Sequence, residues 1–188
     1  MASEEANRAK LRRAFDAHYK AVSRYCHRRL PADDANDAVA QVFAIAWRKV
    51  DEMPTGESTL PWLYGVARYE VSSVRRSTQR RRNLREKLDG QAYHPEAGPE
   101  ALVVRNLEQR DMIRALHSLR PSDQEVLRLR AYEELSIPEI AVVLGCSVEA
   151  AKKRAARAMR RLRRAAGVGT EPIVVSGERP AFDEGGEG

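Results

Sequence analysis

Residues 136–164, SIPEIAVVLGCSVEAAKKRAARAMRRLRR, constrain the fold most, because they carry the signals of two short helices joined by a tight turn. Ser136 is placed to cap the first helix, with Glu139 three residues on as its capping-box partner. Gly145 stands where a left-handed residue commonly ends a helix, and Ser147 is placed to cap the second helix. The segment therefore predicts a helix-turn-helix.

The second helix of this pair has two different faces. Small or apolar residues recur at helical spacing and are expected to point inward: Val148, Ala151, Ala155, Ala158 and Leu162. The outward face carries the cations Lys152, Lys153, Arg154, Arg157, Arg160, Arg161 and Arg164. A basic helix is often only a solvated face, but a cationic helix after such a turn is typical of one that enters the major groove of DNA. A membrane-surface helix would carry large apolar residues opposite its charges, and alanines stand there instead.

Charge and composition indicate a polyanionic binding partner and argue against an enzymatic activity. The 188 residues carry a formal net charge of +6, and the basic excess lies mainly in residues 75–82 and 152–164.

Cys26 and Cys146 form no metal-binding pattern and are expected to be core thiols in a reducing cytoplasm. No phosphate loop or nucleophile motif is present, so no enzyme activity, catalytic residue, metal or cofactor is expected. No segment is apolar enough for membrane insertion, and the N-terminus lacks the apolar core of a secretion signal, so a cytoplasmic protein is expected.

Helical periodicity dominates the chain, and strand signals are almost absent, so the fold is predicted to be all-α. One apolar stripe, which includes Phe15 and Tyr19, is expected to end at Pro31. Asp33 or Asp34 is expected to cap the next helix, and a third helix begins near Thr59. Ser122 with Glu125 predicts another capping box further along. The predicted organisation is two small helical domains on a flexible linker: a bundle over 8–88, the linker over 89–100, the helix-turn-helix domain over 101–167 and a disordered, acidic, glycine-rich tail over 168–188.

The first domain holds two polar constellations. Asp33, Asp34, Asp37 and Gln41 form an acidic strip on one helix face, which composition alone would assign to solvent. In residues 59–76 an aromatic cluster alternates with cations, and its members are Trp62, Tyr64, Tyr69, Arg68, Arg75 and Arg76. Aromatic rings beside cations are typical of a single-stranded nucleic acid site. The alternative is that Trp62 and Tyr64 belong to the core, which is favoured for Trp62.

At these residues the chain resembles a bacterial sigma factor of the sigma-70 class, in particular the extracytoplasmic-function group, which keeps only regions 2 and 4. Residues 34–47, DANDAVAQVFAIAW, resemble the region 2.2 pattern, and residues 61–68, PWLYGVAR, resemble the start of regions 2.3 and 2.4. Residues 115–163 resemble region 4 almost throughout. The resemblance spans about residues 11–164 and places three patterns in the family's order.

The resemblance implies a promoter-specificity subunit with three working surfaces. Core RNA polymerase, through the clamp helices of its largest subunit and its flap region, is the implied partner, and the clamp-binding residues would be Asp34, Asp37, Gln41 and Arg48. The −10 promoter element would meet the loop 53–59 and the helix residues Arg68, Tyr69, Ser72, Ser73, Arg75 and Arg76. The −35 element would meet Glu149, Ala150, Lys152, Lys153, Arg154 and Arg157. An anti-sigma factor is a further candidate partner.

Three departures from the family pattern bear on specificity. Tyr69 and Ser73 stand where the family often has Asn and Asp or Asn, which affects the −10 base preference. Asn36 with Asp37 replaces a usual Glu-Asp pair and removes one charge from the core-docking surface. The acidic tail has no counterpart in the minimal pattern. One hypothesis is that it shields the basic recognition helix, and the favoured alternative is a solvated tail.

Two other protein classes compete with this interpretation. A one-component regulator would bind duplex operator through its helix-turn-helix without polymerase, usually as a dimer. The patterns around Gln41, Phe43 and Trp47 and around Trp62 and Tyr64 argue against it. An RNA-binding protein that uses residues 75–82 would be expected to carry an RNA-recognition sheet, for which the sequence has no strand signal.

Overall fold

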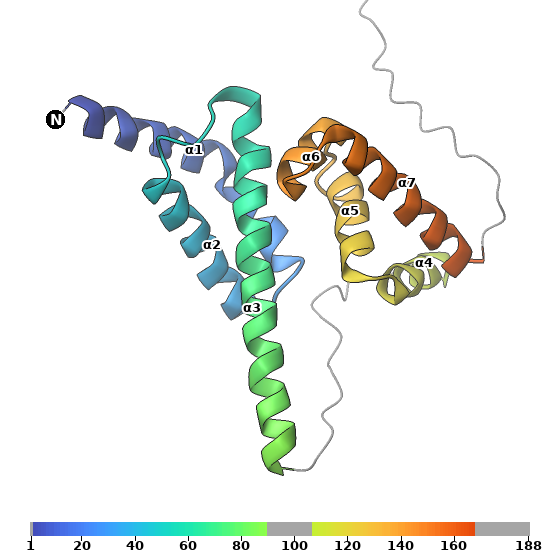
Figure 1. The fold of residues 1–188 in the computed structure, drawn as a ribbon. Helices are drawn as coiled ribbons and strands as arrows, with labels where there is room; N and C mark the ends of the chain where they lie inside the picture. The colour runs from blue at the N-terminus through green and yellow to red at the C-terminus, as the bar shows by residue number, and fades with distance from the viewer. Residues whose placement is uncertain (1, 90–106, 168–188) are drawn as a thin grey trace, which may run out of the picture.

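The structure, a computed structural model, describes residues 2–89 and 107–167. This part of the chain is built from α-helices and one 3₁₀ turn and contains no strand, so the all-α prediction is confirmed. The elements are α1 (Ala2–His27), α2 (Ala32–Arg48), η1 (Gly56–Ser58), α3 (Thr59–Asp89), α4 (Leu107–Ser118), α5 (Pro121–Ala131), α6 (Ile137–Leu144) and α7 (Val148–Ala165). We call α1–α3 the N-terminal module and α4–α7 the C-terminal module (Figure 1). The predicted tail and all of the predicted linker except Asp89 lie outside the described residues.

The N-terminal module is a bundle of three helices. Val22, Cys26, Val42 and Leu63 are completely buried where α1, α2 and α3 meet. Because α2 begins directly after Pro31, no side chain caps it, and the predicted cap by Asp33 or Asp34 is wrong. Both aspartates instead occupy the first turn of α2, where negative charge favours the helix dipole.

Helix α3 is longer than the apolar pattern alone indicates. Its first half packs in the bundle, and its second half, which has little to bury, extends away from the other helices as one continuous helix (Figure 1). No proline or glycine interrupts residues 66–89. Side chains one helical turn apart also form hydrogen bonds along the exposed surface. Gln79 donates to Asn83 at 2.7 Å, and Arg81 donates to Ser77 at 3.2 Å.

In the C-terminal module, α7 packs against α4, α5 and α6. Helix α5 begins two residues earlier than the predicted capping box requires, because a cap at Ser122 would start the helix at Asp123. Pro121 takes the first helical position, which suits its fixed φ and missing N–H, and Arg120 is the N-cap residue. Ser122 is therefore already inside the helix, and its predicted capping box with Glu125 is wrong.

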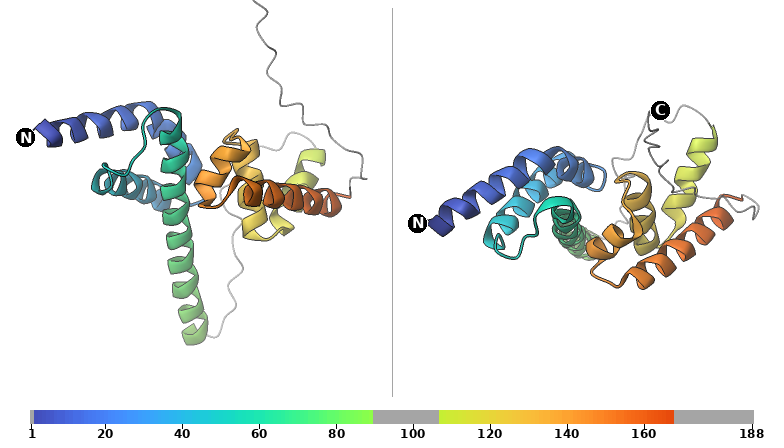
Figure 2. Two further views of the ribbon diagram at one scale, coloured as in Figure 1. Left: turned by 45° about the horizontal axis from the view of Figure 1, so that its top comes forward. Right: turned by 90° about the horizontal axis from the view of Figure 1, so that it is seen from above.

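The two modules pack against each other. Helix α6 lies along α3, so that α3 is flanked by the other N-terminal helices on one side and by α6 on the other (Figure 2). Val71 of α3 belongs to the same buried cluster as Ile140 and Val143 of α6. Gly65 lies at this contact, where an added Cβ would be 3.7 Å from the carbonyl oxygen of Val143, an ordinary van der Waals distance. One apolar core therefore continues from the bundle into the helix-turn-helix.

Candidate nucleic-acid interface

The predicted turn signals position the helix-turn-helix. Ser136 Oγ accepts from the Glu139 N–H at 3.4 Å, and the Glu139 carboxylate accepts from the Ser136 N–H at 2.7 Å, so the capping box is confirmed. Gly145 ends α6 in the left-handed region with φ 61°. Ser147 Oγ accepts from the Ala150 N–H at 3.2 Å and caps α7. These local bonds fix where α7 begins relative to α6.

The two faces of α7 agree largely with the predicted pattern. Ala151 and Ala158 are completely buried, and Ala155 and Leu162 are half-buried. Val148, which was expected to point inward, is 50% exposed. It is the first residue of α7, and the end of a helix is enclosed on fewer sides than its middle. The small buried residues let α7 lie close to its neighbours while its cations face outward.

The residues predicted to face the −35 element all lie in the first three turns of α7. Glu149, Lys152, Lys153, Arg154 and Arg157 are exposed. Ala150, the sixth residue of the predicted set, is only half-exposed and belongs to the cap. An ion pair of 3.5 Å joins Lys153 to Glu149, and both partners are largely solvated, so it holds neither side chain firmly. The face is therefore an accessible donor surface.

The residues predicted to face the −10 element lie on one stretch of α3. Arg68, Arg75 and Arg76 are exposed, and Ser72 and Ser73 are half-exposed. Tyr69 is 63% exposed, so its ring is open to a stacking partner. The other two aromatic residues of the motif differ, since Tyr64 is buried in the core and Trp62 packs partly against it.

The loop before α3 is held at both ends. Met53 and Thr59 are buried, and the residues from Thr55 to Ser58 between them are exposed. The Thr59 hydroxyl donates to the Pro54 carbonyl oxygen at 3.1 Å, and Gly56 takes a positive φ of 69° in the 3₁₀ turn. The loop therefore projects from a fixed base at the N-terminal end of α3.

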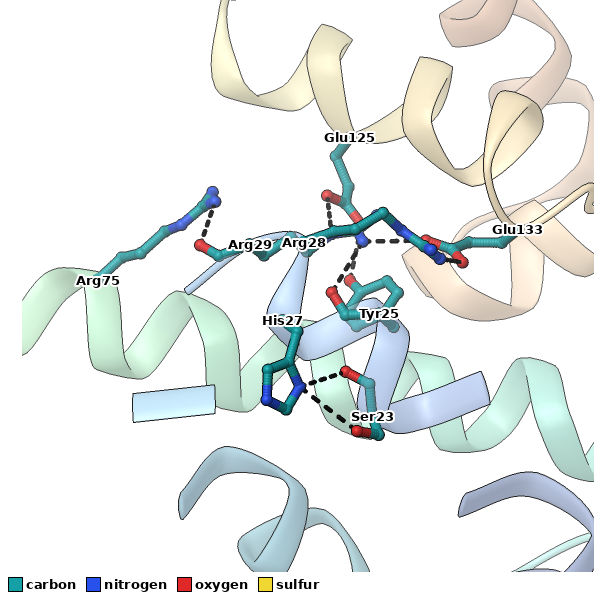
Figure 3. A network of polar contacts seen from close by, with 8 residues as sticks. All are labelled: Ser23, Tyr25, His27, Arg28, Arg29, Arg75, Glu125 and Glu133. Carbon is teal, nitrogen blue, oxygen red and sulfur yellow. Dashed lines mark hydrogen bonds and ion pairs between the residues drawn. The ribbon is translucent and has the colours of Figure 1, made fainter. Parts of the chain in front are cut away.

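A contact with the main chain just after the end of the first helix fixes the position of Arg75. Its Nη2 donates to the main-chain carbonyl of Arg29 at 2.8 Å (Figure 3). Although the residue as a whole is exposed, its guanidinium is partly buried, and this desolvation, and next the nearby Arg128, lower the pKa of Arg75; an arginine nevertheless stays charged at neutral pH. The contact places this charge at the junction of the two modules.

A cleft of about 880 Å³ lies between α3 and the helices α5 and α7, and it is lined by most of the predicted −10 face and by Arg154 and Arg157 of the predicted −35 face. We call it the arginine cleft, because it is lined by Arg68, Arg75, Arg76, Arg120, Arg154, Arg157 and Arg161. Two carboxylates, Asp123 and Glu125, also line it. Tyr69 lies in the same wall as the α3 arginines. The predicted −10 face and part of the predicted −35 face therefore oppose each other across one strongly cationic space.

The predicted polymerase-docking residues follow one strip of α2. Asp37, Gln41 and Arg48 are exposed and Asp34 is half-buried, and their spacing of three, four and seven residues places them on one side of the helix. The structure thus brings all four together on the surface.

Beside this strip lies an aromatic patch that the sequence pattern missed. Phe15 and Tyr19 of α1, expected in the core, are 42% and 41% exposed, and Trp47 of α2 is 38% exposed. Phe15 meets the ring of Phe43 at 4.8 Å between centroids. A second hollow, of about 530 Å³, is bordered by Leu11, Phe15 and Trp47. An exposed apolar patch next to a polar strip is typical of a protein-docking surface.

No group of three or more possible metal ligands comes together in residues 2–89 and 107–167. Cys26 is buried, and burial raises the pKa of its thiol to about 12, which keeps the thiol protonated. Cys146 is free and half-buried. Among the helices that the structure describes, none combines the length and apolarity needed to cross a membrane.

Comparison with known families gives two matches. The family model described as Sigma-70 region 2 matches residues 14–81, and the model described as Sigma-70, region 4 matches residues 109–162. The RNA polymerase sigma factor CnrH of Cupriavidus metallidurans is 31% identical over 140 residues, which cover 71% of this chain and 73% of CnrH. The sigma factor NccH of Alcaligenes xylosoxydans xylosoxydans is 29% identical over 136 residues and shares the same coverage.

Solved structures agree with these matches. The sigma factor RpoE of Bartonella quintana, crystallised with the anti-sigma factor NepR, superposes with a TM-score of 0.61 at 25% identity, over 84% of this chain and 96% of that chain. The structure of CnrH with the cytosolic domain of CnrY superposes with a TM-score of 0.54 at 22% identity, over 82% and 85% of the two chains, and shows a similar fold.

Proposed function

Because the chain belongs to the extracytoplasmic-function group of sigma-70 family RNA polymerase sigma factors, we propose that α2, α3 and α7 each carry one of its three binding tasks. As a sigma factor it binds core RNA polymerase and directs transcription initiation at promoters. It supplies recognition rather than a catalytic group, and it acts in the cytoplasm with the polymerase. One observation supports this assignment of tasks above all: α3 and α7 bear exposed cations and belong to separate modules.

Helix α2 is the core-docking element. Its exposed strip of Asp37, Gln41 and Arg48, with Asp34 at the edge, offers both charges and amide groups to the clamp helices of the largest polymerase subunit. The neighbouring aromatic patch around Trp47 adds apolar area to the same surface. Polar groups set the orientation of such a contact, and buried aromatic side chains supply much of its free energy.

Helix α3 binds the −10 element as a partly single-stranded site. A base taken out of the stack costs a few kcal/mol, which stacking and hydrogen bonds in a pocket must offset. Tyr69 supplies an exposed ring, and Arg68 and Arg76 supply charges for the phosphates on either side. Ser72, Ser73 and Arg75 complete this surface.

Helix α7 binds the −35 element in the major groove. Arg and Lys side chains of its first turns can donate to guanine edges or to phosphates. Glu149 and Ala150 stand at the N-terminal end of the helix, which approaches base edges most closely in helix-turn-helix proteins. The rest of the C-terminal module contacts the flap region of the polymerase, which holds α7 at a fixed distance from α3.

Core polymerase allows the weak −10 and −35 contacts to form together, which raises the overall affinity for the promoter. Two DNA-binding modules on a linker gain affinity only when both can bind at the same time, and that depends on their separation. Core polymerase sets this separation, so the free chain is expected to bind promoters poorly. An anti-sigma factor that covers these surfaces is a candidate regulator, since the similar RpoE structure contains the anti-sigma factor NepR.

Selection of transcripts from random promoter templates tests the proposal. Sigma-free core polymerase is mixed with the full chain, and run-off products are sequenced. The expected result is a pair of conserved elements at a constant spacing. The variant Asp37→Arg, which reverses a charge on the docking strip, should lose transcripts without losing helicity. Equal transcript yields with and without the chain would refute the proposal.

A further inference from the structure

Val148 is an exposed apolar residue at the start of α7. It is the first residue of the helix that is predicted to face the −35 element, and 50% of its surface is exposed. A single exposed apolar residue is ordinary on a protein surface, so the exposure by itself indicates no role. The position of Val148 in the helix-turn-helix and the chemistry of the major groove give the exposure a further meaning.

Hydrogen bonds on both sides of the turn fix the position of Val148. The Cys146 N–H donates to the carbonyl oxygen of Ala141 at 3.0 Å and closes the end of α6. Ser147, directly before Val148, caps α7 by accepting from the Ala150 N–H at 3.2 Å. The main chain at Val148 is therefore held relative to both helices of the motif.

The side chain of Val148 is also stiff. A valine in a helix has one strongly preferred χ1 rotamer, because two carbons branch from its Cβ. Contact with a partner therefore costs it little conformational entropy, whereas the long side chain of Lys152, one turn further along the same side of α7, loses much more. Val148 thus presents a fixed apolar surface beside a mobile cation.

Helix propensity and core packing do not account for a valine at this position. Valine is a weaker helix former than the alanines, lysines and arginines that make up most of α7. The completely buried contacts of α7 come from Ala151 and Ala158, and half of the Val148 surface stays in water. In the free chain, this exposed half has nothing apolar to bury against.

The major groove offers one apolar partner for such a side chain. The N-terminal residues of a recognition helix are the ones that contact base edges in helix-turn-helix proteins. The base edges present hydrogen-bond donors and acceptors, which valine cannot bond, and in addition the C5 methyl group of thymine. The neighbouring Glu149 and Lys152 suit the polar edges, and Val148 suits the methyl group.

We propose that Val148 is a specificity-determining residue, which packs against the C5 methyl group of one thymine in the −35 element. The proposal rests on the assignment of α7 to the −35 element under the proposed function, and it adds the base that this residue distinguishes. Removal of both apolar groups from water stabilises the complex with DNA and leaves the free chain unaffected.

Replacement of thymine by deoxyuridine tests this contact, because the two bases differ only in the C5 methyl group. The holoenzyme of core polymerase and the full chain is bound to duplexes that carry the selected −35 element, with each thymine of either strand replaced in turn. Competition measured by fluorescence anisotropy gives the affinities. At one thymine, loss of the methyl group should weaken binding about fourfold, the effect of leaving one apolar carbon in water.

The variant Val148→Ala assigns the methyl effect to this side chain. It should weaken binding to the thymine duplex by a similar factor and should bind the thymine and deoxyuridine duplexes equally at that position, as a double-mutant cycle detects. Val142→Ala is the matched control, because Val142 is also 50% exposed but lies on α6. This control should keep the full preference for thymine. Circular dichroism checks that both variants retain their helices.

A −35 element in which no thymine is sensitive to loss of its methyl group would overturn the proposal. A methyl effect that persists unchanged in Val148→Ala, or that Val142→Ala abolishes equally, would also overturn it. Failure of the proposed function gives a different result: the unmodified holoenzyme would bind the selected −35 duplex no better than a scrambled one, and both proposals would fall.

Discussion

Arg161 of α7 donates to the Asp123 carboxylate of α5, with 2.5 Å between Nη1 and Oδ2. Asp123 is buried in the first turn of α5, where the helix dipole also favours its negative charge. Arg161 is partly exposed, on the side of α7 that borders the arginine cleft. The pair joins the recognition helix to its supporting helix and so helps to set the direction in which α7 presents its cations.

Removal of this carboxylate should loosen α7. We expect Asp123→Ala to lower the free energy of unfolding by roughly 1 kcal/mol, the range for a pair that is partly open to solvent, and to weaken holoenzyme binding to a −35 duplex. Denaturant unfolding and fluorescence anisotropy measure the two effects. Asp111→Ala is the control, since its 3.5 Å pair with Arg114 is largely solvated. Equal behaviour of the two variants would show that the Arg161 contact does not position α7.

Arg154 and Arg157 should each contribute to −35 binding, and the salt dependence of the affinity should show whether each contacts a phosphate or a guanine. Loss of a phosphate contact should reduce the slope of log affinity against log salt by about 1, whereas loss of a bidentate guanine contact should cost about 1–3 kcal/mol and relax the sequence preference. Alanine variants of each are measured as holoenzymes over a salt series on several −35 sequences. Arg12→Ala, exposed on α1 and outside both predicted DNA-binding faces, should change neither quantity.

Tyr69 should act through its ring rather than its hydroxyl. If the ring stacks on a base of the −10 element, Tyr69→Ala should cost about 1–3 kcal/mol of open-complex stability, and Tyr69→Phe should cost far less. Fluorescence of a 2-aminopurine placed at successive −10 positions reports the unstacked base. A similar loss in both variants would assign the role to the hydroxyl, and no loss in either would remove Tyr69 from the site.

The packing of the two modules should be sensitive to acid, because Glu125 of the C-terminal module accepts from Arg29 and Tyr25 of the N-terminal module. The pKa of Glu125 in the packed structure is lower than its ordinary value of 4.5, so its stabilising effect is complete above pH 4.5 and is lost as the pH falls through this lower value. The groups that face Glu125 are Arg29 and Tyr25 from the N-terminal module, Arg128 on α5 and Arg75 on α3. The arginines stay charged and the tyrosine stays neutral in this range.

We therefore expect an unchanged radius of gyration from pH 8 to pH 5 and an expansion below pH 4.5 while helicity is retained. Small-angle scattering with circular dichroism checks both. Glu125→Gln, which has no carboxylate at this position, should be expanded already at neutral pH. Modules that stay packed down to pH 3 would contradict a role of Glu125 in holding them together.

Structural features that depend only on residues within about one helical turn, such as helix caps, could be predicted from the sequence. The capping box of Ser136 and Glu139, the left-handed Gly145 and the cap by Ser147 all depend on neighbours within four residues, and each is confirmed. The same kind of signal failed at Ser122, because Pro121 is better suited to the first helical position and moved the start of α5. Local patterns predict that a helix exists more securely than where it begins.

Contacts between distant residues could not be predicted in this way. Arg29 and Glu125 stand 96 residues apart, and nothing in the local pattern around either distinguishes it from a surface charge. The exposure of Phe15 and Tyr19 was missed for a related reason: periodicity identifies an apolar face but not how far a neighbouring helix covers it. The predicted site residues were found by the family pattern, and the cleft that brings Arg154 and Arg157 of α7 opposite the −10 residues of α3 was visible only in three dimensions.

Affinity for a selected promoter fragment, measured with and without core polymerase, tests the central claim most directly. The account predicts weak binding of the free chain at physiological salt and an affinity at least about 100-fold higher for the complex with core, as expected when two linked sites are held at a fixed spacing. Equal promoter affinity of the free chain and of the core complex would contradict it.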